Sequence, residues 1–251
     1  AWIVRFLTGN RAILRLRREN LRIDWQIVKR TVLLGLSTFT MRVTECAVQV
    51  VCNWKLAGYG DAYVAVMTVI SSIRQVLNLP LSGFVQGFQP VVGYNYGARL
   101  YGRVRECIRF TTLCCFVYAA ASCALVMLVP ELLIRMFTDN ASLVSLGIPA
   151  VRIYFCGFAF LFMQMAGQQS FVALGKSRQA VFFSLLRKAF IVVPLTVILP
   201  RFLGVNGVFW AETVSDVVGS SACFITFMLT VYRRELVGLE DGEERLGDAV
   251  P

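Results

Sequence analysis

Residues 83–97 read GFVQGFQPVVGYNYG, and this stretch decides how the rest of the chain is interpreted. It lies in an apolar segment long enough to cross a bilayer, yet it holds four glycines, one proline, two glutamines and an asparagine. In a membrane helix such residues free backbone groups and place amides in hydrocarbon, which is tolerated where neighbouring helices, water or a cavity satisfy them. The stretch therefore predicts a helix break along a transport path. A Gly/Pro kink between closely packed helices is the alternative.

Composition places the chain in a membrane and excludes several other classes. Of its 251 residues 57% are hydrophobic, and its mean hydropathy is +0.66. It has no histidine, which is the commonest metal ligand and general base at neutral pH. The eight cysteines follow no metal-binding spacing and are interpreted as small buried side chains. Nucleophile-elbow, phosphate-loop and HExxH motifs do not occur in the sequence. We expect neither an enzyme nor a cofactor.

Six apolar segments, each near the ~20 residues needed to cross a bilayer, indicate an all-α integral membrane protein built as a six-transmembrane-helix bundle. They lie at about 31–56, 62–94, 108–129, 144–174, 180–199 and 208–232. We expect residues 1–30 to be the end of a preceding helix and a basic connector, 31–233 the transmembrane lobe, and 234–251 an acidic tail. Because the chain begins without Met, we also expect it to be part of a longer protein.

The basic residues gather on one side of this topology. If the connector is cytoplasmic, nineteen of the 25 Lys and Arg residues fall on the cytoplasmic side: Arg5, Arg11, Arg15, Arg17, Arg18, Arg22, Lys29, Arg30, Arg99, Arg103, Arg105, Arg109, Lys176, Arg178, Arg187, Lys188, Arg233, Arg234 and Arg245. The opposite side has only Lys55, Arg135 and Arg201. This bias predicts a multi-pass protein of the plasma membrane with its connector and C-terminus in the cytoplasm, and it explains the net charge of +10 without a nucleic-acid partner.

Polar residues inside the spans are the candidate coupling-ion and substrate positions. In the first span Arg42, Glu45, Gln49 and Asn53 are three, four and four residues apart, which places them on one helical face. A carboxylate at bilayer depth costs several kcal/mol unless it is paired, protonated or wet. Burial would favour protonation of Glu45, whereas Arg42 would favour its ionised form. A coupling site is one interpretation, and a static Arg42–Glu45 pair that fixes packing is the other.

Further polar positions occur in the later spans. Glu212 and Asp216 share a face of the sixth span and begin less than two turns after Gly207, so we expect them near the outer, hydrated end. Gln164 and Gln168 are also one turn apart, and their amides suit hydrogen bonds to a substrate or between helices. Arg74 and Asn78 form a similar pair in the second span.

The run GFVQGFQPVVGYNYGARLYGRVRECIRF at 83–110 resembles the multidrug and toxic compound extrusion (MATE) family. The matching positions include the candidate gating residues Gln86, Gln89, Pro90, Tyr94, Asn95 and Gly97, and also Tyr96, Ala98, Arg103, Val104 and Arg105. Residues 21–36 resemble the family's connector into its seventh helix, and residues 204–216 resemble the entry to its last helix. The resemblance covers essentially the whole chain, as the second half of such a protein.

This resemblance implies one lobe of a two-lobe, twelve-helix transporter with a central cleft that opens alternately to each side of the bilayer. It implies export of drugs and organic cations against H⁺ or Na⁺, with the missing N-terminal lobe and the lipid bilayer as partners. Glu45 lies ten residues after Gly35, the spacing at which the sodium-linked branch has an acid. The region 161–169, where that branch has a second acid, offers only glutamines here, so Asp216 or Glu212 would have to replace it.

Topology refines the opening interpretation. The end of the motif at Asn95 is predicted to reach the cytoplasmic face, with Gln86 and Gln89 about two turns inward. The motif is then a flexible segment that bends as access alternates, and Glu45 is the better coupling candidate. Two other functions fit the same pattern. A flippase for lipid-linked oligosaccharides or polysaccharides would use the basic residues Arg42, Arg74 and Arg152, whereas a non-transporting membrane scaffold would bury the Glu45 stripe against partner side chains.

Overall fold

The computed structural model describes residues 24–238. Most of the predicted connector, residues 1–23, and the acidic tail from residue 239 onward lie outside the described residues. Two compact units are distinguished, residues 1–38 and residues 39–251. Within the first unit the described part is the start of helix α2 (Trp25–Ala57). The remainder of α2 and all later helices belong to the second unit.

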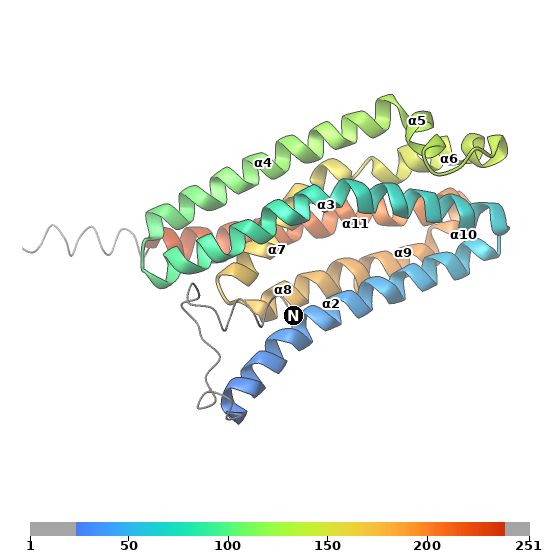
Figure 1. Cartoon of the computed structure of the whole chain (residues 1–251). Helices are drawn as coiled ribbons and strands as arrows, with labels where there is room; N and C mark the ends of the chain where they lie inside the picture. The colour runs from blue at the N-terminus through green and yellow to red at the C-terminus, as the bar shows by residue number, and fades with distance from the viewer. Residues whose placement is uncertain (1–23, 239–251) are drawn as a thin grey trace, which may run out of the picture. The chain divides into compact units, whose positions relative to one another are not determined.

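The second unit is a bundle of long helices in which α11 (Asn206–Phe227) is central, and Figure 1 shows α11 running beneath α3 (Asp61–Gly97). Helix α11 packs against α7 (Leu161–Ala173), the π-helix η3 (Leu186–Val192) and α6 (Ala141–Phe155). Helix α4 (Tyr101–Leu128) packs against α3 and α7. The shorter elements are α5 (Pro130–Arg135), the 3₁₀-helix η2 (Phe158–Phe160), α8 (Ser177–Leu185), α9 (Val193–Ile198), α10 (Pro200–Leu203) and the π-helix η4 (Met228–Val237).

Five helical segments of the described residues are long and apolar enough to cross a membrane. They are Asp61–Gly97, Tyr101–Leu128, Ala141–Ala173, Ser177–Leu203 and Asn206–Arg233, and they correspond to the last five predicted spans. Helix α2 corresponds to the first predicted span and has 33 residues. It is not among the five, and Arg42 and Glu45 near its middle lower its hydropathy.

Helix α3 passes through the glycine- and glutamine-rich motif without interruption, with Pro80 and Pro90 inside it. The predicted helix break at 83–97 is therefore wrong. Proline removes one backbone donor but leaves most of the helical hydrogen bonds in place, and Val85, Phe88 and Val92 pack this end of α3 into the bundle. The helix ends at Gly97 instead, where Arg99 adopts a φ of 60° before α4 begins.

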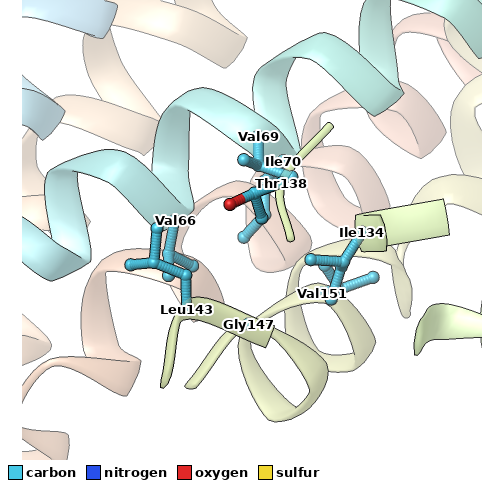
Figure 2. A pocket seen from close by; sticks show the side chains of 8 residues that line it. All are labelled: Val66, Val69, Ile70, Ile134, Thr138, Leu143, Gly147 and Val151. Carbon is cyan, nitrogen blue, oxygen red and sulfur yellow. The ribbon is translucent and has the colours of Figure 1, made fainter. Parts of the chain in front are cut away.

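Among the described residues, the buried core forms two apolar clusters toward the two ends of the bundle. One gathers side chains from α2, α3, α6 and the start of α11, and the other gathers the ends of α3, α7 and α11 with the start of α4. Figure 2 shows a small, mostly apolar pocket in the first cluster, lined by Val66 and Ile70 of α3 together with Ile134 and Val151. Of the eight residues that line the pocket, only Thr138 has a polar side chain. The pocket is therefore part of the apolar packing between these helices.

Candidate functional site

Five charged side chains from three helices meet inside the bundle and form what we call the charge cluster. Arg74 comes from α3, Arg187 and Lys188 are consecutive residues of η3, and Glu212 and Asp216 lie one turn apart on α11. The Asp216 side chain is fully buried and that of Glu212 is 6% exposed. Such charges persist in a protein interior only when they are closely paired.

The cluster is connected through both carboxylates. Arg74 bridges the two acids, with Nη1 3.1 Å from Oε1 of Glu212 and Nη2 3.0 Å from Oδ1 of Asp216. On the other side, Nη1 of Arg187 lies 2.6 Å from Asp216 Oδ1, and Nζ of Lys188 lies 2.5 Å from Glu212 Oε1. Each of these two carboxylate oxygens is therefore contacted by two cationic groups. The guanidinium of Arg74 also lies 5.3 Å from the centre of the Tyr154 ring, a cation–π contact.

Small residues let the helices approach closely enough for these contacts. A Cβ at Gly219 of α11 would lie 2.7 Å from Cγ and 3.0 Å from Cβ of Arg187, so glycine makes room for the arginine stem. A Cβ at Gly157 would lie 2.7 Å from the Thr213 carbonyl oxygen. In the same place the Thr213 hydroxyl donates to the Ile153 carbonyl at 2.5 Å. These contacts hold α11 against α6 and so fix where Glu212 and Asp216 lie along the bundle.

The positions of the consecutive cations Arg187 and Lys188 depend on a widened turn of η3. The Val193 N–H donates to the carbonyl of Lys188, five residues back, as in a π-helix. Pro194 follows in α9, and a proline ring collides with the carbonyl four residues before it in a regular α-helix. Widening the turn relieves that collision. The Ser215 hydroxyl donates to the Arg187 carbonyl at 3.0 Å and ties the widened turn to α11.

This arrangement corrects two sequence-based predictions. Glu212 and Asp216 do share a face, but they are buried and ion-paired instead of hydrated at the outer end. Arg187 and Lys188, assigned above to the cytoplasmic side, lie near the middle of the span Ser177–Leu203. The sequence did contain a sign of this cluster. Arg187 and Lys188 lie within the apolar run 180–199, and two acids follow in the next span, which indicates ion pairing inside the membrane.

The predicted polar face of α2, formed by Arg42, Glu45, Gln49 and Asn53, has two halves with different surroundings. Arg42 Nη1 lies 3.2 Å from Glu45 Oε2, and their side chains are 78% and 46% exposed on the bundle. One turn later, Gln49 donates to Ser71 of α3 at 3.2 Å and to Asn53 at 3.5 Å. The Arg42–Glu45 pair thus forms on an accessible surface of the lobe, while the second half of the stripe packs against α3. The scaffold hypothesis required burial of Glu45, and its exposure here does not support that hypothesis.

The predicted glutamines form hydrogen bonds between helices. Gln164 is buried and donates to Gln168, whose own Nε2 donates to the Ala180 carbonyl of α8 at 3.4 Å. Gln89 of the motif donates to Gln169 of α7 at 2.5 Å. These amides join α3, α7 and α8, which is one of the two roles expected for them.

The other motif residues lie on the outer face of α3. Gln86, Pro90 and Tyr94 are exposed on this lobe, Tyr94 by 78%. Asn95 donates to the Val91 carbonyl at 2.8 Å, within its own helix. Their predicted role in gating stays a prediction.

Comparison with known proteins identifies the family of this bundle. The MatE family model matches residues 38–198, which include most of α2 and the whole of the glycine- and glutamine-rich motif. The chain belongs to the MatE family. This confirms the predicted resemblance and the all-α membrane fold. Members of this family are transporters, so the prediction that the chain is not an enzyme is also confirmed.

Relatives of known function are multidrug transporters. The multidrug export protein MepA of Staphylococcus aureus (strain NCTC 8325 / PS 47) is 24% identical over 204 residues, which cover 79% of this chain and 43% of MepA. The solved structure of the MATE multidrug transporter DinF-BH is 32% identical with a TM-score of 0.79 over 94% of this chain and 52% of that chain. A MATE structure in the bent conformation gives a TM-score of 0.85 at 18% identity, over 96% of this chain and 53% of that chain. The chain therefore spans about half the length of its relatives.

Proposed function

We propose that this chain is the C-terminal lobe of a cation-coupled antiporter that exports drugs and organic cations by alternating access across the plasma membrane. The observation that carries the proposal is the charge cluster, two buried carboxylates held by three cations inside a lobe with the MATE fold. Buried ion pairs stabilise a fold poorly compared with apolar side chains of similar volume. An ionisable residue inside a membrane is therefore interpreted first as part of a functional site.

The missing partner in this proposal is the N-terminal lobe. The relatives are about twice as long as this chain, and the chain leaves a large apolar surface on α3 uncovered, including Leu79, Phe84 and Val91. In the proposed protein this surface faces lipid or the other lobe. The substrate is bound in the cleft between the lobes, and the connector and C-terminus lie in the cytoplasm.

The contacts of the cluster favour H⁺ over Na⁺ as the coupling ion. Oδ1 of Asp216 and Oε1 of Glu212 are each already contacted by two cationic groups. A sodium ion bound there would add to three cationic groups that already outnumber the two carboxylates, and the surplus positive charge would repel it in a medium of low dielectric constant. A proton can instead be exchanged on a side chain with no new ligands.

Glu45 is a second coupling candidate in this proposal. Its carboxylate is exposed on the lobe and paired with Arg42 alone among the described residues. In the full-length protein a cationic substrate reaching this surface competes directly with the Arg42 guanidinium. The flippase alternative gains nothing from the geometry, because Arg42 and Arg74, two of the basic residues on which it relied, are both engaged in ion pairs.

The test is dye export by the full-length protein that contains this chain. Expressed in efflux-deficient cells, it is expected to lower the accumulation of a fluorescent cationic dye, and collapse of the proton gradient is expected to abolish this effect. Glu212→Gln is expected to lose export while the protein still reaches the membrane. Asp61→Asn, an exposed acid in the first turn of α3, is the matched control and is expected to keep export. Unchanged accumulation over a broad panel of cationic dyes would refute the proposal.

A further inference from the structure

The charge cluster holds one more positive charge than negative charge. Two guanidinium groups, of Arg74 and Arg187, face the carboxylates of Glu212 and Asp216 and balance them. Lys188 adds a third cation, in contact with Glu212 Oε1 at 2.5 Å. The cluster is therefore neutral when Lys188 is uncharged and carries one net positive charge when Lys188 is protonated.

Other groups around Lys188 do not cancel this surplus. Helix α2 contributes the Cys52 thiol, which lies 3.8 Å from the Thr196 hydroxyl of α9. Helix α6 contributes the Tyr154 phenol, whose ring faces Arg74. Both groups are neutral in their ordinary state at pH 7. The charges that face Lys188 are thus Glu212 and Asp216 from α11, Arg74 from α3, and Arg187 from its own helix.

Lys188 is the cation of this cluster that can release its proton. Arginine remains charged in proteins, whereas the lysine ammonium loses its proton readily when it is buried. Protonation of either acid would instead raise the surplus from one positive charge to two. The Lys188 side chain is also slightly exposed, at 12%, whereas that of Asp216 is fully buried.

We infer that Lys188 carries the coupling proton of the proposed transport cycle. The step is Lys–NH₂ + H⁺ ⇌ Lys–NH₃⁺ at Nζ; no other bond forms or breaks, and the cluster changes from neutral to one positive charge. The positive state repels a cationic drug within the same lobe, and the neutral state admits it, so proton and drug exclude one another as antiport requires. This inference rests on the proposed function and assigns its proton to a lysine on the π-helix η3, not to a carboxylate.

The experiment measures drug binding and proton release in the purified full-length protein. With one cationic dye as the probe, the dissociation constant of the wild type is expected to rise about tenfold per pH unit on acidification, and about one proton is expected to leave per dye bound in weak buffer. Lys188→Met is expected to bind the dye with an affinity independent of pH and to release no proton. Lys188→Arg, which keeps the charge permanently, is expected to bind at least tenfold more weakly than wild type at neutral pH. Lys55→Arg, outside the cluster, is the matched control and is expected to behave as wild type.

Each result decides the inference. Because the four remaining charges balance, Lys188→Met is expected to fold and to melt within a few degrees of the wild type, and a variant that does not fold refutes the inference. Proton release or pH-dependent binding that persists in Lys188→Met also refutes it. If the wild type binds and exports the dye but uses Na⁺, the lysine assignment fails while the exporter proposal stands. If the wild type exports no dye at all, the proposed function itself fails.

Discussion

Replacement of Gly219 by alanine tests directly whether the charge cluster depends on close packing between α11 and η3. The added Cβ would lie 2.7 Å from Cγ and 3.0 Å from Cβ of Arg187. These atoms belong to the base of the arginine side chain, so they cannot swing away without moving its guanidinium from Asp216, 2.6 Å away. Gly219→Ala is therefore expected to weaken a buried ion pair and not only to crowd it.

The expected change in the free energy of unfolding is the sum of two destabilising terms and one stabilising term. Overpacking in a core costs about 1–3 kcal/mol, and loss of one partner of a buried ion pair costs about 3–5 kcal/mol. Alanine returns about 1 kcal/mol through its higher helix propensity. Because Asp216 keeps its contact with Arg74, only part of the ion-pair term is lost, and the net destabilisation is expected to be about 2–4 kcal/mol. For a domain of this size that corresponds to a fall in melting temperature of about 5–15 °C.

The buried thiols supply the assay. Cys52, Cys115 and Cys223 are free and buried in the folded lobe, so a thiol-reactive fluorophore reports their exposure as the full-length protein is heated in detergent. Gly83→Ala is the matched control, because nothing outside its chain neighbours and its own helical backbone lies within 4 Å of the Cβ it would add to α3. It is expected to melt at or slightly above the wild-type temperature. If Gly219→Ala melts at the wild-type temperature, the steric argument is wrong. It is also wrong if the substitution still lowers the melting temperature in an Arg187→Ala background.

Four further variants test the site. Asp216→Asn leaves two guanidinium groups facing a neutral amide, and it is expected to destabilise the lobe by about 3–5 kcal/mol and to abolish dye export. Gln89→Leu and Gln169→Leu each break one hydrogen bond between α3 and α7. Because they break the same bond, their effects on the free energy of unfolding are expected to be non-additive by about 0.5–1.5 kcal/mol. Glu45→Gln disrupts an exposed ion pair, so stability is expected to change by less than about 1 kcal/mol while export falls.

Two of these predictions have a matched control variant, and the third has an outcome that would contradict it. Asp61→Asn leaves the cluster intact and is expected to match the wild type in melting and export. Gln86→Leu removes a neighbouring exposed glutamine of the same motif. Its effect on the free energy of unfolding is expected to add to that of Gln169→Leu. Coupling as large as that of Gln89 would contradict the assigned hydrogen bond. Normal proton-driven export by Glu45→Gln would remove Glu45 from the list of coupling candidates.

Much of the fold was predictable from the sequence because bilayer thickness sets the length of each apolar run. The last five predicted spans match helices in the structure to within several residues at most ends. The predicted break in α3 failed because glycine and proline permit a break without requiring one, and neighbouring helices hold the segment in helical form. The Arg42–Glu45 pair, three residues apart on one helix, needed only local geometry, and it forms as the spacing suggested.

The sequence by itself determined the membrane class, the family motif and the polar residues to consider. Only the tertiary structure decided which of them meet. Helices that are apolar on every side show no periodicity from which a buried face can be read, so the direction in which Arg74, Arg187 and Lys188 point depends on packing. Arg74 contacts Asp216, 142 positions away along the chain. The π-turn in η3 and the missing side chain at Gly219 bring the two basic residues of that helix onto α11, and no local pattern in the sequence specifies that approach.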